Sequence, residues 1–182
     1  SLRRQRQMCI RDSLYPMNAL ADDQARRLTA TLTGDPALST VTAAIYTGNQ
    51  AGTRGTVSDK GLITDRHAIR DTAPDILLTN YKMLDQLLLR EDDQPIWAQS
   101  ATSLQYLVLD EFHTYDGAQG TDVAMLLRRL GLALKSHWHQ DDPALTAEDW
   151  ARPLGKITPV ATSATLGDKS DPTVMLDFAH TV

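Results

Sequence analysis

The chain has 182 residues and a formal net charge of −5, from 18 Lys and Arg against 23 Asp and Glu. This length suits one domain with a sizeable core. The mild acidity means that no basic tail indicates nucleic-acid binding, although a local basic stripe would be enough for it. Cys9 is the only cysteine, which excludes a disulfide within the chain and favours a reducing compartment, so we expect a cytoplasmic location. The sequence contains no run of about 18 apolar residues, so we expect no membrane partner.

The first residues differ in character from the rest of the chain. Residues 1–13, SLRRQRQMCIRDS, are basic and show no amphipathic period. They also resemble adapter sequence translated at the end of an assembled fragment. We predict that 1–13 is a non-native or disordered segment, with an ordinary basic tail as the alternative, and that a single domain occupies 14–182.

The first half of that domain alternates between strand-like and helix-like blocks. Its apolar spacing predicts, in chain order, a strand ending at Leu14–Pro16, a helix over Ala19–Leu32, a strand over Val41–Tyr46, a surface excursion over 49–73, a strand over Ile76–Leu78 and a helix over Tyr81–Arg90.

The second half continues the alternation. We predict a central strand over Leu104–Leu109, a helix over Asp122–Lys135 with Thr121 as N-cap, a surface insertion over 136–155, a strand over Ile157–Ala161 and the start of a helix within Thr173–Phe178. Strands that alternate with helices imply an α/β fold with a parallel sheet and right-handed crossovers.

The central predicted strand ends abruptly in acids, in the run Asp110-Glu111-Phe112-His113. Carboxylates are not buried unpaired, so the chain leaves the sheet at Asp110 and presents both acids at the carboxyl edge, where open α/β sheets bind ligands. Two such acids suit a Mg²⁺-bound nucleotide. Asp110 would hold Mg²⁺ through its water shell, and Glu111 would polarise the water that attacks the γ-phosphate, while His113 could sense that phosphate. The plain alternative is a strand that ends in a charged turn.

A run of small hydroxyl residues comes directly after the last predicted strand, in Thr162-Ser163-Ala164-Thr165-Leu166-Gly167. Hydroxyl groups at a strand end can bond a neighbouring acid and relay its state to another surface. A turn that merely closes the strand is the alternative.

DEFH followed by TSATLG resembles motifs II and III of the superfamily-two, DEAD/DEAH-box helicases. Other segments agree in order: Tyr15–Gln24 resembles motif Ia, Tyr46-Thr47-Gly48 the next strand-end glycine motif, and Pro74–Asn80 motif Ib. His113-Thr114-Tyr115 and Gly117-Ala118-Gln119-Gly120, leading into Leu127-Arg128-Arg129-Leu130, are similar to the DExH helicases related to Lhr. The resemblance covers nearly all of 14–182 and implies a RecA-like first motor domain, incomplete at both ends.

The resemblance also implies roles. ATP and Mg²⁺ would be the cofactors, and nucleic acid, DNA more than RNA, the partner. Ser163 and Thr165 would couple nucleotide state to strand grip. Residues located just after strands would contact the phosphate backbone of the nucleic acid, and these are Pro16, Asn18, Ala19, Thr79 and Asn80.

Two departures from the family pattern limit what this chain would do alone. The P-loop pattern G-x-x-x-x-G-K-S/T does not occur in the 182 residues, and neither does a second RecA-like domain. We therefore expect an ATP-dependent helicase as the parent protein and negligible hydrolysis by this chain alone. The alternative is a degenerate RecA-like scaffold that binds nucleic acid or protein without ATPase activity.

Two weaker features carry less chemistry. His137 and His139 lie near two aspartates, but a solvated polar insertion is a better interpretation than a metal site. Trp97, Trp138 and Trp150 could stack on bases, although we expect them to anchor loops to the domain.

Overall fold

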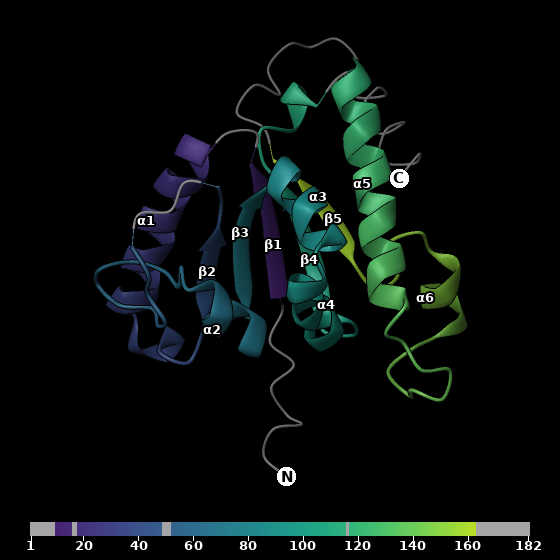
Figure 1. Cartoon of the computed structure of the whole chain (residues 1–182), viewed down its shortest axis with the longest axis horizontal. Coiled ribbons are helices and arrows are strands. Elements are labelled where there is room, and N and C mark those ends of the chain that lie inside the picture. The colour runs from purple at the N-terminus through teal and green to yellow at the C-terminus, as the bar shows by residue number, and fades with distance from the viewer. Residues whose placement is uncertain (1–9, 16–17, 49–51, 116, 163–182) are drawn as a thin grey trace.

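The computed structural model describes residues 10–15, 18–48, 52–115 and 117–162 (Figure 1). In these ranges a five-stranded parallel sheet has the order β2-β3-β1-β4-β5. Its strands are β1 (Ile10–Tyr15), β2 (Ala43–Tyr46), β3 (Ile76–Asn80), β4 (Leu104–Leu109) and β5 (Thr158–Ala161). The predicted parallel α/β sheet is confirmed.

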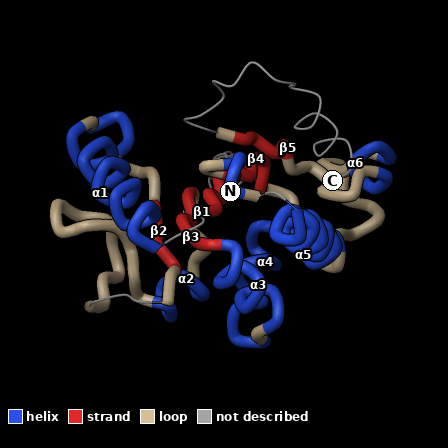
Figure 2. The backbone as a smooth tube through the Cα atoms, turned by 90° about the horizontal axis from the view of Figure 1, so that it is seen from above, coloured by secondary structure: helices blue, strands red, loops and turns tan. Residues whose placement is uncertain are grey.

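Helices cover both faces of this sheet. They are α1 (Asn18–Gly34), α2 (Arg66–Asp71), α3 (Tyr81–Leu89), α4 (Gln94–Ser100), α5 (Gly117–Lys135) and α6 (Ala147–Ala151), with short 3-10 turns η2 (Pro36–Leu38), η3 (Glu91–Asp93) and η4 (Phe112–Thr114). Figure 2 shows α1 on one face and α3, α4 and α5 on the opposite face. The three-layer arrangement is what parallel strands with helical crossovers require.

The core reflects the alternation of side chains along each strand. In β2, Ala44 and Tyr46 join the large core beneath α3, α4 and α5, while Ala43 and Ile45 join the smaller core beneath α1. Successive side chains of a strand point to opposite faces, so a strand covered on both faces needs a continuous apolar run. That is why Val41–Tyr46 is recognisable from sequence, although β2 itself begins at Ala43.

The first strand extends into the segment predicted to be non-native or disordered. β1 begins at Ile10, so residues 10–13, predicted as part of a non-native or disordered segment, form a strand in the middle of the sheet. This strand pairs with β3 on one side and β4 on the other. Residues 10–13 form a strand because they pair with these two neighbouring strands. The segment has no hydrophobic period of its own from which a strand could be predicted. Residues 1–9 lie outside the described ranges.

Two further boundaries are corrected. Helix α5 begins at Gly117, so Thr121 lies inside the helix and is not its N-cap. The predicted excursion over 49–73 contains α2, a helix of six residues that buries Ile69. The helix expected within Thr173–Phe178 lies outside the described residues.

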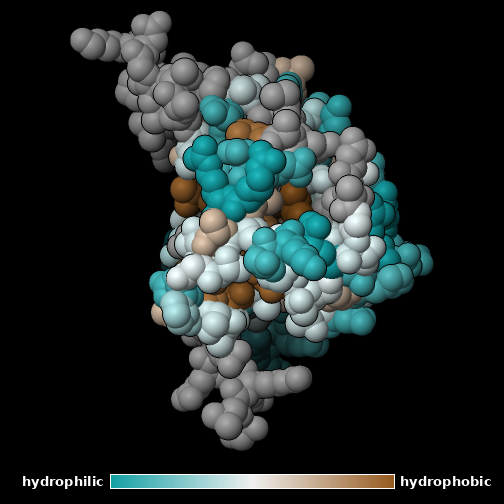
Figure 3. Space-filling view, turned by 90° about the vertical axis from the view of Figure 1, so that its left-hand side faces the viewer, coloured by the Kyte–Doolittle hydropathy of each residue, from teal (hydrophilic) through white to brown (hydrophobic). Residues whose placement is uncertain are grey.

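The surface of the molecule is largely polar on the side that Figure 3 presents. Mostly hydrophilic and neutral side chains cover this side, with small apolar areas between them. In the described ranges, the protein contains no helix with the length and apolar character that crossing a membrane requires.

Candidate functional site

Residues at or next to the ends of the five strands lie in one row at the carboxyl edge of the sheet. Strand register joins them in the order Ala161, Leu109, Leu14, Thr79 and Tyr46. Neighbouring strands are about 4.8 Å apart, so the segments that leave two adjacent strands begin close together. This edge therefore brings together the acidic run after β4, Thr162 after β5 and the starts of α1 and α3.

The acidic turn comes directly after β4. Asp110 and Glu111 are both half-buried, and Glu111 has a left-handed backbone with φ 50° and ψ 46°. The Asp110 carboxylate accepts a hydrogen bond from the Glu111 amide at 3.0 Å, through Oδ1. The Glu111 carbonyl in turn accepts from the Thr114 amide and hydroxyl, each at 2.8 Å. These bonds fix a tight turn that holds two carboxylates at the edge, as the sequence predicts.

Thr162, the first residue of the hydroxyl run, contacts this turn directly. Its hydroxyl donates to Oδ1 of Asp110 at 2.5 Å. Its backbone amide donates to the Leu109 carbonyl and its carbonyl accepts from the Phe112 amide, both at 2.9 Å. Three bonds from one residue thus join the two runs that resemble motifs II and III. Ser163 and Thr165, the predicted coupling residues, lie outside the described residues.

An aromatic cluster lies against the same turn. Tyr115 packs edge-on against Tyr81 and Phe112, each with ring centroids 6.4 Å apart. Burial raises the pKa of the Tyr115 phenol, and the neighbouring Asp110 charge and Tyr81 raise it further. Among the described residues, the Tyr115 hydroxyl is buried without a hydrogen-bond partner. It stays a neutral donor beside an acid.

The predicted strand-contact residues have different surroundings. The Thr79 side chain is fully buried, and its hydroxyl donates to the Tyr46 carbonyl at 2.8 Å, which ties β3 to β2. Asn80 caps α3, with Oδ1 accepting from the Met83 amide at 2.8 Å. Asn18 and Ala19 open α1 at the same edge.

Two further predicted positions are Pro16 and His113. Pro16 lies outside the described residues, and His113 lies in η4, directly after Phe112. Sequence reasoning missed Tyr81 and Tyr115 as neighbours, because they lie far apart in the chain and only the shared sheet edge brings them together.

Two of the three tryptophans are buried, whereas Trp150 is 39% exposed. Trp97 is 1% exposed and its indole donates to the Leu87 carbonyl at 3.0 Å, while Trp138 donates to the Ala101 carbonyl at 2.7 Å. The anchoring role predicted for these two is confirmed. Within the described ranges, no three His, Cys, Asp or Glu side chains gather as a potential metal site, near His137 or elsewhere.

A family model for the DEAD/DEAH box helicases matches residues 12–171. The chain belongs to the DEAD/DEAH box helicase family. The match spans the acidic turn, Thr162 and the hydroxyl run, and it confirms the family predicted from those motifs.

Known proteins resemble this domain in sequence and fold. It is 42% identical over 79 residues to Druantia protein DruE of Escherichia coli, covering 40% of this chain and 4% of the relative. It is 30% identical over 117 residues to ATP-dependent helicase hrq1 of Schizosaccharomyces pombe, covering 64% and 10%. The crystal structure of the DUF1998 helicase MrfA bound to DNA and AMPPNP superposes with a TM-score of 0.60 at 23% identity, covering 90% of this chain and 19% of that one. The chain therefore spans about a tenth or less of the curated relatives named here.

Proposed function

We propose that this chain forms part of the first motor domain of an ATP-dependent nucleic-acid helicase, in which nucleotide hydrolysis is coupled to strand binding. The observation that carries the proposal is the hydrogen bond from Thr162 to Asp110. This bond joins the acidic turn, proposed to act on the nucleotide, to the start of the hydroxyl run, proposed to couple nucleotide state to nucleic-acid binding.

The residues present fit a magnesium nucleotide. Asp110 uses Oδ1 for both of its hydrogen bonds, and among the described residues Oδ2 accepts none. A carboxylate oxygen fixed in this way, at the edge where α/β folds bind ligands, suits the water shell of Mg²⁺. When bound, Mg²⁺ and ATP supply the metal charge and the γ-phosphate to be attacked.

Glu111 is the proposed general base. Its left-handed backbone costs a non-glycine residue about 1–2 kcal/mol, and such strain is concentrated at functional sites. In the described ranges it is the only non-glycine residue with positive φ. We propose that its carboxylate, which belongs to the same turn as Asp110, accepts a proton from the attacking water. His113 lies within the same turn and is proposed to sense the phosphate.

The strand would lie across the starts of α1 and α3. Amides at helix N-termini bind phosphates, so Pro16, Asn18 and Ala19 are proposed contacts at α1. Asn80 is proposed at α3, and Thr79 acts there by fixing β3 against β2. We propose DNA over RNA because the MrfA structure contains DNA.

We further propose that the chain acts within a longer protein. The relatives are many times its length, and the P-loop pattern does not occur in its 182 residues. A P-loop and a second RecA-like domain with an arginine finger would complete the nucleotide site. The chain by itself should hydrolyse ATP negligibly, and a cytoplasmic location is proposed with it.

The test uses the full-length protein that carries this chain. Phosphate release from ATP is measured alone, with single-stranded DNA and with RNA of matching sequence. We expect stimulation by DNA to exceed that by RNA, and no release from the 182-residue chain. A full-length protein that binds the strand but neither binds nor hydrolyses ATP would instead establish the scaffold alternative.

A further inference from the structure

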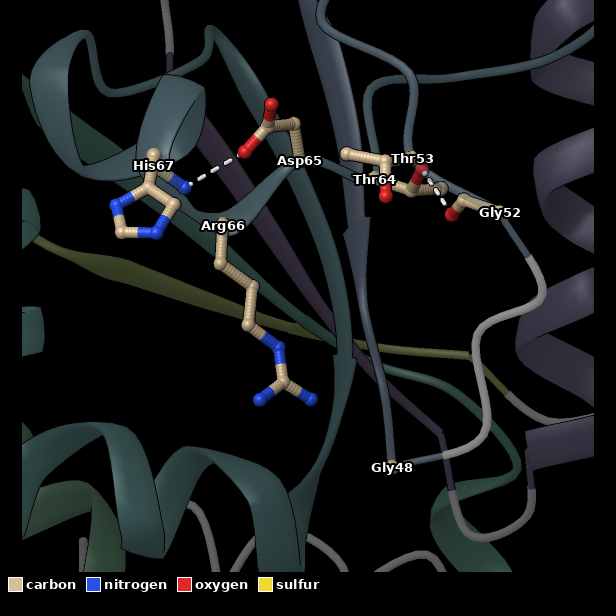
Figure 4. Close-up of a pocket in the computed structure, with 7 residues that line it drawn as sticks. All are labelled: Gly48, Gly52, Thr53, Thr64, Asp65, Arg66 and His67. Carbon is tan, nitrogen blue, oxygen red and sulfur yellow. Dashed lines mark hydrogen bonds between the residues drawn. The ribbon is translucent and has the colours of Figure 1, made fainter.

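A cavity of about 310 Å³ lies beyond the last strand of the sheet, away from the acidic turn. It is lined by Gly48, Gly52, Thr53, Thr64, Asp65, Arg66 and His67 (Figure 4). β2 is the outermost strand on this side, and its last residue, Tyr46, pairs with Thr79 in the row at the carboxyl edge. The cavity therefore continues the line of strand ends that runs from Asp110 past Asn80.

Register places Arg66 at this edge as well. Ile63 pairs in parallel with Ala44, donating to the Ala43 carbonyl and accepting from the Ile45 amide at 3.0 Å each. The chain then rises beside β2, so that Arg66 lies near the level where β2 ends. In Figure 4 the Arg66 side chain extends from the start of α2 toward Gly48.

A buried network holds a platform beneath Arg66. The Arg66 guanidinium carbon lies 5.1 Å from the centre of the Tyr46 ring, a stacking distance for a cation on an aromatic face. The Tyr46 hydroxyl donates to Asp93 at 3.1 Å, and Arg70 donates to the same oxygen at 2.7 Å. Tyr46 and Asp93 are both 0% exposed. Because the ring cannot move, Arg66 is oriented before any ligand arrives.

The two arginines of α2 differ in what they face. Arg70 is committed to Asp92 and Asp93. Arg66 is exposed and, among the described residues, belongs to no ion pair. The carboxylate of the adjacent Asp65 caps α2 and accepts a hydrogen bond from the His67 amide at 2.9 Å. A planar guanidinium that is held in place and lacks a carboxylate partner matches phosphate oxygens.

We propose that Arg66 binds a phosphodiester of the nucleic acid. This contact would lie at the end of β2, the β-strand next to β3, where Asn80 is the neighbouring proposed contact. This deepens the proposed function and rests on it. The cavity has the size for a single nucleotide-sized group, at the small end of ligand sites. Adjacent strand ends are about 4.8 Å apart, so a backbone that lies at the end of β3 reaches the end of β2 without a gap.

The test measures binding of a fluorescein-labelled oligothymidylate to the full-length protein over a range of salt concentrations. Arg66→Gln should weaken binding about tenfold, and the slope of log affinity against log salt should fall by about 0.7, the share of one phosphate on a single strand. Arg66→Lys should keep the slope, since it keeps the charge, while binding less tightly than arginine.

The matched control is Arg152→Gln, which removes a charge paired with Glu148 beside α6. It should alter neither slope nor affinity. Equal shifts for Arg66→Gln and Arg152→Gln, or an unchanged slope for Arg66→Gln, would overturn the proposal. So would a loss of ATP affinity with strand affinity intact, which would assign the cavity to free phosphate. If the wild-type protein fails to bind the strand at all, the proposed function fails first.

Discussion

The hydrogen bond from Thr162 to Asp110 makes the most demanding prediction. Thr162→Val preserves the side-chain shape and β-branching but removes the donor. A hydrogen bond to a charged group has a net value of about 1.5–3 kcal/mol, but Thr162 is exposed, and water can replace the lost donor. We therefore expect a loss of folding stability of only about 0.5–1 kcal/mol. The effect on turnover should be larger, because Asp110 loses the bond that fixes its orientation at the proposed metal site. We expect kcat to fall about tenfold, which corresponds to an activation barrier about 1.4 kcal/mol higher.

The assay is strand-stimulated ATP turnover by the full-length protein, with thermal unfolding measured in parallel. Thr158→Val is the matched control, because Thr158 is likewise an exposed threonine, at the start of β5, the strand that Thr162 follows. Thr162→Ser should restore most of the turnover, since it returns the hydroxyl. Equal kcat values for Thr162→Val and Thr158→Val, or a fall in kcat no larger than the fall in the folded fraction, would contradict this role of Thr162.

Three further predictions concern neighbouring groups. Tyr115→Phe should raise the free energy of unfolding by up to about 1 kcal/mol in a denaturant titration, because it removes a buried hydroxyl that has no partner in the described part of the chain; a loss above this size would contradict that account. Asp93→Asn should lower it by about 3–5 kcal/mol, because an arginine loses its buried counter-charge, and a loss below about 1 kcal/mol would show that the pair contributes little. Ser163→Ala combined with Thr165→Ala should retain ATP hydrolysis and impair strand unwinding. Equal loss in both assays would exclude a coupling role.

The sequence predicts the sheet and the acidic turn for a simple physical reason. A continuous apolar run must be buried on both faces, and carboxylates at its end must leave the sheet. The apolar run therefore predicts the strand Leu104–Leu109, and Asp110 predicts where that strand ends. Parallel register then brings every strand end to one edge, which is why the position of Thr162 beside the acids is foreseeable from the chain order.

The features that the sequence does not predict depend on contacts between distant residues. Ile10 starts β1 because strands lie on both sides of it. Helix α2 has six residues, too few for a periodic signal, and forms because Ile69 is buried in the core. The sequence makes Thr79 a candidate nucleic-acid contact, yet its hydroxyl donates a hydrogen bond to Tyr46 of the adjacent strand β2. Arg66 and Arg70 look alike in sequence, and only the position of Asp93 distinguishes the paired arginine from the exposed one.

The most direct test of the whole account is ATP turnover by the Glu111→Gln variant of the full-length protein, measured at saturating single-stranded DNA. Glu148→Gln, an exposed glutamate on α6, is the matched control. We predict that Glu111→Gln abolishes turnover while affinity for nucleotide and strand stays at the wild-type level, because the general base is lost and the site is not. Wild-type turnover in Glu111→Gln would contradict the assignment of this turn as the hydrolytic centre.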